Sequence, residues 1–209
     1  MMWLQTCEQQ HAGCKYENTG WLPTRLVYVG DLDSTVLPHL CISSSLPQRT
    51  RYLALSHCWG TKPIFRLLNS NITELQQSIP FDQLPRTFQH AIGLTGAFGF
   101  QYLWIDSLCI IQDSASDWAA ESVTMGEVYV NSYCNIAATG AENGEVGLGF
   151  KRNPRALRPL EIRIPARPPN SRGVPTGSYY CMDDFWQDGI VKAPLNRRAW
   201  VFQERLLSR

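Results

Sequence analysis

Between residues 52 and 139, short apolar runs alternate with longer segments whose apolar residues recur at helical spacing. The runs are Tyr52–Ser56 (YLALS), Tyr102–Asp106 (YLWID) and Cys134–Thr139 (CNIAAT). Short continuous apolar runs are typical of strands covered on both faces, and helices between them are typical of β-α-β units. The alternation therefore predicts an α/β fold, with a parallel sheet flanked by helices.

Two helices are expected between these strands. Pro85 suits the first turn of one helix, and apolar residues at helical spacing continue from it to Gly99. Ser116 or Asp117 is expected to cap the second helix. Its buried stripe is predicted to be Trp118, Met125, Val128 and Tyr129. Of the other tryptophans, Trp59, Trp104 and Trp200 are also expected mainly in the core, although one beside a polar loop can contact a ligand as well.

The flanking segments carry weaker patterns. Residues 1–50 are interpreted as an N-terminal leader, with a helix over Trp3–His11 and a strand over Leu26–Val29. From about 140 to 194 the periodicity disappears, and residues 151–175 hold six prolines and six arginines. This composition predicts a long irregular insertion within a domain that covers residues 51–209.

The charge and the cysteines narrow the classes of partner and compartment. Nineteen basic and eighteen acidic residues give a net charge of +1, which provides no field for binding nucleic acid or an acidic membrane. Seven cysteines without framework spacing indicate reduced thiols, and the polar N-terminus does not resemble a signal peptide. We therefore expect a cytoplasmic protein with neither nucleic acid nor membrane as a partner.

Polar side chains follow the first two strands at the points where these strands end. Ser56, His57 and Trp59 follow the first, and Asp106 ends the second. In right-handed β-α-β units these loops meet at one edge of the sheet, where α/β proteins bind ligands. We expect the four residues to line a binding site, although every parallel sheet ends its strands in polar loops and a structural role stays open.

Cysteine chemistry is a further alternative. Cys58 or Cys109 could act as a nucleophile with His57 as its base, because a thiolate at neutral pH needs a neighbouring imidazole. Buried cysteines more often serve as small apolar side chains, and we favour that interpretation. The chain contains no G-x-G-x-x-G, P-loop or H-E-x-x-H motif, so the sequence does not support a Rossmann dehydrogenase, a P-loop NTPase or a zincin.

The leader contains one group of residue types that can bind metal. Cys7, His11 and Cys14 have C-x3-H-x2-C spacing, which could supply three zinc ligands. Cys41 is the one fourth ligand that the sequence suggests. Because no fourth ligand lies nearby in the sequence, we expect no metal and no resident cofactor.

Five segments, taken together and in order, resemble the blocks of the fungal heterokaryon incompatibility (HET) domain. They are Tyr52–Gly60 (YLALSHCWG), Leu84–Thr87 (LPRT), Tyr102–Asp113 (YLWIDSLCIIQD), Asp117–Tyr129 and Arg198–Glu204 (RAWVFQE). The resemblance implies a protein of filamentous fungi that acts in non-self recognition and triggers programmed cell death. Members of the family typically continue past the last block, so the C-terminal part is expected to be truncated.

The HET domain is in turn similar to Toll/interleukin-1 receptor (TIR) domains, which have a flavodoxin-like fold. Trp200–Glu204 resembles the TIR helix motif in which a glutamate four residues after a tryptophan supports cleavage of NAD. This resemblance makes Glu204 the candidate catalytic residue, with NAD as a substrate. A fixed carboxylate would stabilise the oxocarbenium-like transition state of that reaction.

Further residues complete the predicted nucleotide site. Arg197 or Arg198 could contact pyrophosphate, and Trp200 is a further binding candidate. Glu121 and Cys109 are secondary candidates, with an ion pair as the alternative role of Glu121. The alternative function is a non-enzymatic signalling module that acts by forming a homo-oligomer or by binding other incompatibility proteins.

Overall fold

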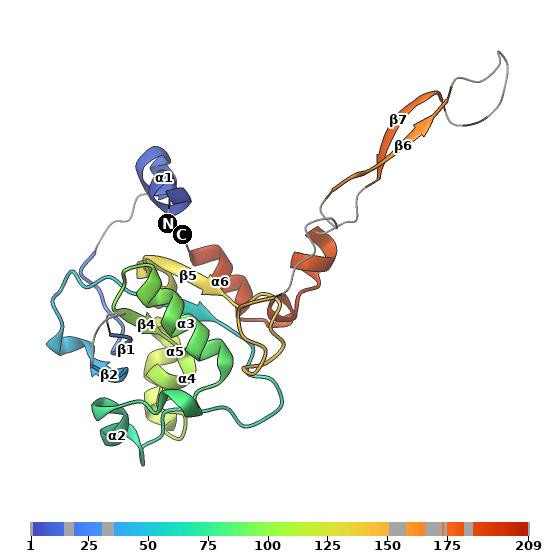
Figure 1. The fold of residues 1–209 in the computed structure, drawn as a ribbon. Coiled ribbons are helices and arrows are strands. Elements are labelled where there is room, and N and C mark those ends of the chain that lie inside the picture. Colours follow the sequence, from blue (N-terminus) through green and yellow to red (C-terminus); the bar gives the residue numbers. More distant parts are fainter. Residues whose placement is uncertain are drawn as a thin grey trace. The chain divides into compact units, whose positions relative to one another are not determined.

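The computed structural model describes residues 2–14, 19–30, 36–150, 158–165, 173, 175–181 and 186–208. The chain divides into two compact units, one made of residues 1–148 with 194–209 and the other of residues 149–193. The first unit contains a five-stranded sheet with its helices, and the second contains a two-stranded sheet (Figure 1).

The strands of the first unit are β1 (Arg25–Tyr28), β2 (His39–Ile42), β3 (Leu53–Ser56), β4 (Tyr102–Trp104) and β5 (Cys134–Ala137). Its α-helices are α1 (Met2–Gln10), α2 (Ile72–Gln77), α3 (Arg86–Ala97), α4 (Asp106–Cys109), α5 (Ala115–Asn131) and α6 (Val201–Leu207). Its short 3-10 helices are η1 (Ala12–Cys14), η2 (Ser43–Ser45), η3 (Phe81–Gln83) and η6 (Pro194–Arg197). The second unit contains β6 (Leu160–Ile164), β7 (Gly177–Cys181) and the π-helical turn η5 (Gln187–Val191).

The central sheet has the strand order β2-β1-β4-β3-β5. Strand β3 is parallel to both of its neighbours, with Leu53 opposite Leu103 of β4 and Ala54 opposite Asn135 of β5. These three strands are the three apolar runs of the sequence, and their order in space is second, first, third. Flavodoxin-like sheets begin with this order. The predicted α/β fold is confirmed, and its sheet is mainly parallel, because β1 alone of the five strands runs against the others.

The core explains why β3 has no polar alternation. All four of its residues are buried, because the strand lies between two others and has helices over both faces. The crossovers β3-α3-β4 and β4-α5-β5 run in opposite directions, so right-handed connections place α3 and α5 on opposite faces. Phe88 of α3 and Tyr129 of α5 are both buried in this core.

The N-terminal segment takes part in the same sheet. The helix and the first strand expected in residues 1–50 are present as α1 and β1. Strand β1 is antiparallel to β4 and to β2. Strand β2 was not expected from the sequence, because its four residues after Pro38 are too few to show the alternation of a strand. Leu26 and Val27 are fully buried, so this segment contributes to the core.

Three local expectations were wrong. The cap of α5 is Ser114, whose side chain accepts a hydrogen bond from the Asp117 backbone amide at 3.2 Å, and not Ser116 or Asp117. Several cap-forming residues follow one another here, so the sequence alone could not select the first of them. Asp106 begins the short helix α4 and is not the last residue of a strand. Trp118 is half-exposed and does not belong to the buried stripe of α5.

The second unit is more regular than its composition predicts. Strands β6 and β7 pair antiparallel, with Leu160 opposite Cys181 and Ile164 opposite Gly177. In β6 the apolar residues alternate with Glu161 and Arg163, which is the period of a strand. The high content of proline and arginine around this short run obscured that period in the sequence. Residues 151–157, 166–172, 174 and 182–185 of the predicted insertion lie outside the described residues.

Gly60 closes the loop after β3, and its replacement by alanine is expected to destabilise the protein. Its φ is +73°, and an added Cβ would lie 2.5 Å from Cβ of Asn143. We expect Gly60→Ala to lower the free energy of unfolding by about 2 kcal/mol or more, measured by chemical denaturation. Gly99→Ala is the matched control, because φ is +78° there but no atom lies within 4 Å of the added Cβ. Equal losses in the two variants would show that the contact with Asn143 is unimportant.

Candidate functional site

A cavity of about 200 Å³ lies where the predicted polar loops and the C-terminal helix meet. Helices α5 and α6 are packed together. The cavity is lined by Trp59, Asp106, Ile110, Gln112, Trp118, Met125, Tyr129, Arg198, Trp200 and Glu204. All ten residues belong to the first unit. Five of them are candidates from the sequence: Trp59, Asp106, Arg198, Trp200 and Glu204.

Asp106 joins the loops that follow β3 and β4. Its Oδ2 accepts a hydrogen bond from Nε1 of Trp59 at 2.9 Å, and its Oδ1 lies 3.6 Å from Nε2 of His57. The rings of His57 and Trp59 are nearly parallel, with centroids 6.5 Å apart. The carboxylate thus holds the tryptophan in position at the wall of the cavity.

His57 is buried beneath this wall and does not line the cavity. It is 1% exposed, and Phe88 of α3 packs edge-on against its ring. Among the described residues, neither ring nitrogen has a hydrogen-bond partner. Burial lowers the pKa of His57 below its ordinary value, the charge of Asp106 raises it in part, and that of Arg198 lowers it further. The imidazole is therefore neutral at neutral pH.

Arg198 connects α6 to the loop after β3. Its Nη1 donates a hydrogen bond to the carbonyl oxygen of His57 and lies 3.7 Å from Oε1 of Glu204. The guanidinium is partly exposed, whereas the Glu204 side chain is buried. Arg197 does not line the cavity and is exposed. Of the two arginines considered from the sequence, Arg198 is the one beside the carboxylate.

Glu204 is the buried acid of the site. It is 3% exposed, and its Oε2 has no hydrogen-bond partner among the described residues. Burial raises the pKa of Glu204 above its ordinary value, while the Ser56 hydroxyl and the Arg198 charge lower it in part and Asp106 raises it. Within the described part of the chain, one carboxylate oxygen of Glu204 is therefore buried without a hydrogen-bond partner.

Ser56 lies behind the carboxylate at the end of β3. It is 2% exposed, and Nδ2 of Asn135 donates a hydrogen bond to its Oγ at 2.9 Å. The same hydroxyl lowers the pKa of Tyr129, which burial holds well above its ordinary value. Ser56 therefore supports the site from below, and like His57 it does not line the cavity.

The tryptophans differ in a way that the sequence did not predict. Trp104 is buried as expected, but Trp118 and Trp200 are 51% and 50% exposed and both line the cavity. Helical periodicity could not separate them from core residues, because a stripe beside a cavity has the same spacing as a stripe beside a sheet. Met125 and Tyr129 of α5, expected only in the core, line the cavity for the same reason.

The two secondary candidates lie in a different network. Oε1 of Glu121 is 3.3 Å from Nη2 of Arg25, and this nitrogen also pairs with Asp117 at 2.6 Å. The Nε of Arg25 donates to the carbonyl oxygen of Cys109 at 2.6 Å. Neither Glu121 nor Cys109 lines the cavity, and Glu121 has the ion-pair geometry that was its alternative role.

The geometry gives little support to cysteine chemistry. Burial raises the pKa of Cys109 to about 12, so its thiol stays protonated at neutral pH. Burial also raises the pKa of Cys58, with Arg198 opposing the shift, and Cys58 packs with Leu195 and Val201. Both thiols therefore have the surroundings of buried apolar side chains.

The neutral, buried His57 makes a pH dependence of stability predictable. Its folded pKa lies below the unfolded value near 6.5, so the unfolded state binds the proton first. The contribution of His57 to stability is therefore complete above pH 6.5 and is lost as the pH falls towards the folded pKa. In His57→Phe this loss should be absent, measured as the free energy of unfolding from pH 7.5 to pH 5. Parallel pH curves for wild type and variant would contradict the prediction.

Comparison with known proteins assigns the family. The model of the heterokaryon incompatibility protein (HET) family matches residues 52–204, which include every residue that lines the cavity. The chain belongs to this family, and heterokaryon incompatibility is the function that membership supports. Neither a curated protein nor a solved structure gives a significant match. Among the described residues, no helix has both the length and the apolar character needed to cross a bilayer.

Proposed function

We propose that this HET protein cleaves NAD or a related nucleotide in the cytoplasm, and that the cleavage triggers programmed cell death in fungal non-self recognition. The observation that carries the proposal is the Glu204 carboxylate, buried at the wall of the cavity with one oxygen unpaired among the described residues. A buried carboxylate in this position is costly for folding and useful for chemistry. NAD would be the substrate and not a resident cofactor.

The chemistry follows from the charge of the transition state. The bond between C1′ of the ribose and the nicotinamide nitrogen breaks heterolytically, and its electron pair leaves with the neutral nicotinamide. The ribose then carries positive charge, which an ionised Glu204 stabilises across the low-dielectric cavity. Water adds to C1′ and loses a proton, so the products are nicotinamide, ADP-ribose and a proton.

The other lining residues suit the rest of the ligand. Arg198 offers the N–H donors that match phosphate oxygens, and it remains partly exposed beside the carboxylate. Trp118 and Trp200 present half-exposed rings on which a nicotinamide or adenine ring can stack. The cavity volume is about 200 Å³, whereas typical ligand sites have volumes of about 300–1,000 Å³. One nucleoside of NAD would therefore enter the cavity, and the rest of the NAD molecule would lie along its mouth.

Release of nicotinamide from NAD is the direct test. The purified chain is incubated with NAD at high protein concentration, and nicotinamide and ADP-ribose are separated by chromatography. Turnover by wild type and its loss in folded Glu204→Gln support the proposal. A folded wild type that consumes neither NAD nor NADP would contradict it and return Glu204 to a structural role.

A specific surface favours the alternative, an interaction module without enzymatic activity. Trp200, Phe202 and Leu206 are at least half exposed at α6, and Phe202 and Leu206 border a groove of about 440 Å³. Exposed apolar patches of this kind are typical of protein interfaces. Self-association that Phe202→Ser abolishes, without nucleotide consumption by wild type, would identify the oligomer as the active species.

A further inference from the structure

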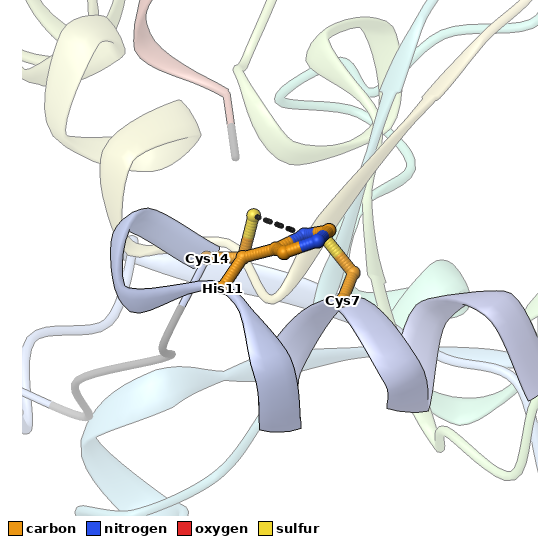
Figure 2. A group of neighbouring side chains, drawn as sticks. All are labelled: Cys7, His11 and Cys14. Carbon is orange, nitrogen blue, oxygen red and sulfur yellow. Dashed lines mark hydrogen bonds between the residues drawn. The ribbon is translucent and has the colours of Figure 1, made fainter.

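Three metal-binding side chains of the N-terminal segment converge outside the nucleotide site. Cys7 lies on α1, His11 follows its last residue, and Cys14 ends η1. Figure 2 shows their side chains turned towards one another, and their ligand atoms all lie within 4.8 Å of one another. Among the described residues, this is the one such group of three or more.

The local backbone explains the convergence. Residues four apart on a helix share a face, so Cys7 and His11 are neighbours, and the His11 amide donates to the Cys7 carbonyl at 3.0 Å. The tight turn of η1 then brings Cys14 back, with its amide donating to the His11 carbonyl at 3.0 Å. The spacing C-x3-H-x2-C thus places three donors on one side of a helix-turn unit.

The distances between the ligand atoms are close to those of a tetrahedral zinc site. Tetrahedral zinc with Zn–S near 2.3 Å and Zn–N near 2.05 Å requires S···N separations of about 3.6 Å. Nδ1 of His11 lies 3.4 Å from Sγ of Cys7 and 4.0 Å from Sγ of Cys14. Two thiolates and an imidazole are soft and borderline ligands that select zinc over magnesium or calcium.

Cys41, the fourth ligand that the sequence suggested, does not belong to the group. It lies on β2, where burial raises the pKa of its thiol and the Tyr28 backbone opposes this rise only in part. The described ligands are therefore three, which leaves one coordination position for water or another donor. This is the ligand count of an open zinc site.

The segment is anchored, so an ion there would act on the folded domain. Oε2 of Glu8, next to Cys7, accepts a hydrogen bond from the Tyr133 hydroxyl at 2.6 Å. Burial and Glu8 raise the pKa of Tyr133 to about 12, which keeps this donor protonated. Zinc binds cysteine as the thiolate, so binding at Cys7 and Cys14 would release their protons.

We propose that Cys7, His11 and Cys14 bind one zinc ion, which connects α1 to η1. The site is independent of nucleotide cleavage, because it lies outside the matched HET residues and shares no residue with the cavity. Zinc that binds only the folded state also adds to the stability of the N-terminal segment.

The test uses the purified full chain in reducing buffer, titrated with zinc against a chromophoric indicator, with zinc content measured by mass spectrometry. We expect one zinc per chain and, with Co²⁺ instead, the charge-transfer absorption of thiolate ligands. Cys7→Ser, His11→Ala and Cys14→Ser should each weaken zinc binding by about 100-fold or more, since a residue that only orients a ligand already contributes about 10–100-fold.

Two controls separate this site from other thiols. Cys181→Ser removes an exposed cysteine of the second unit and should leave zinc affinity unchanged, as should Cys41→Ser. Hydrogen exchange should show amides 7–14 protected by zinc in wild type and not in Cys14→Ser. A reduced wild type that binds no zinc at micromolar concentration overturns the proposal. Wild-type zinc affinity in the variants of Cys7, His11 and Cys14 would also overturn it. The same holds for a Cys7–Cys14 disulfide that persists in reducing buffer with zinc.

Discussion

Replacing Glu204 by glutamine is expected to lower NAD turnover by about 100- to 1,000-fold without lowering thermal stability. The size of the loss is that of removing one preorganised electrostatic group from a transition state. Glutamine keeps the shape of the side chain but not its charge, so binding of the substrate should change less than kcat. Nicotinamide release under single-turnover conditions and the melting temperature of the same sample measure both effects.

The stability half of this prediction follows from the pKa of Glu204. Its folded value is raised by burial, so the stabilising contribution of this group is complete below the unfolded value near 4.5 and is lost as the pH rises through the folded value. Glu204→Gln avoids that loss. Its melting temperature at pH 7.5 should equal or exceed that of wild type, and the difference should vanish at pH 4. A lower melting temperature at pH 7.5 would show that the pair with Arg198 dominates.

Glu121→Gln is the matched control, because Glu121 is also a buried glutamate but lies beside Arg25 and not at the cavity. It should lower the melting temperature and leave the turnover of each folded molecule unchanged. The two variants together would then distinguish a loss of catalysis from a loss of stability. Loss of turnover in both variants, with equal loss of stability, would mean that neither carboxylate has a specific chemical role.

Arg25→Met is expected to destabilise the protein by about 3–5 kcal/mol, the cost of leaving buried charges without their partner. The Arg25 side chain is 6% exposed and pairs with Asp117 and Glu121 of α5. Asp117 also accepts a hydrogen bond from the Ile111 amide at 2.8 Å. The arginine therefore fastens β1 to α5 and to the loop that precedes it, and urea denaturation monitored by tryptophan fluorescence measures the loss.

A surface pair of the same composition provides the comparison. Arg163 lies 2.9 Å from Glu161 on β6, but its side chain is 79% exposed. Arg163→Met should leave the denaturation midpoint unchanged, because water solvates both charges once the pair is broken. Should Arg25→Met not fold, Arg25→Lys keeps the charge and is expected to have an intermediate midpoint. A wild-type midpoint in Arg25→Met would show that α5 is held by apolar packing alone.

Arg25 also illustrates what the sequence could not predict. The strand Leu26–Val29 was expected from its apolar residues, and an arginine at its start gives no local sign of burial. Its partners Asp117 and Glu121 follow about ninety residues later, on α5. An ion pair was considered for Glu121, but nothing in the sequence named Arg25 as the partner. Local periodicity reports which residues share a face, but it does not report which distant element covers that face.

Some residues of the candidate site could be predicted from the sequence, and others could not. The expectation that Trp59 and Asp106 lie together rested on topology, since parallel strands end at one edge, and the hydrogen bond between them agrees with it. Glu204 was predicted from the resemblance to the TIR helix motif, because no local sequence pattern connects it with Ser56 and the other loop residues. Trp118 and Met125 were expected on a buried stripe, and the structure shows that α6 and a cavity cover part of that stripe.

The sequence by itself determined the family, the three parallel strands and the main helices, because these depend on the order and period of residues close together in the chain. Only the tertiary structure decided which carboxylate is buried beside an arginine at a cavity, which tryptophans remain exposed, and where Cys41 lies relative to Cys7. These properties depend on desolvation and on contacts between residues far apart in sequence. No local pattern encodes them, since the same side chain is an ion-pair partner or a site residue according to what packs against it.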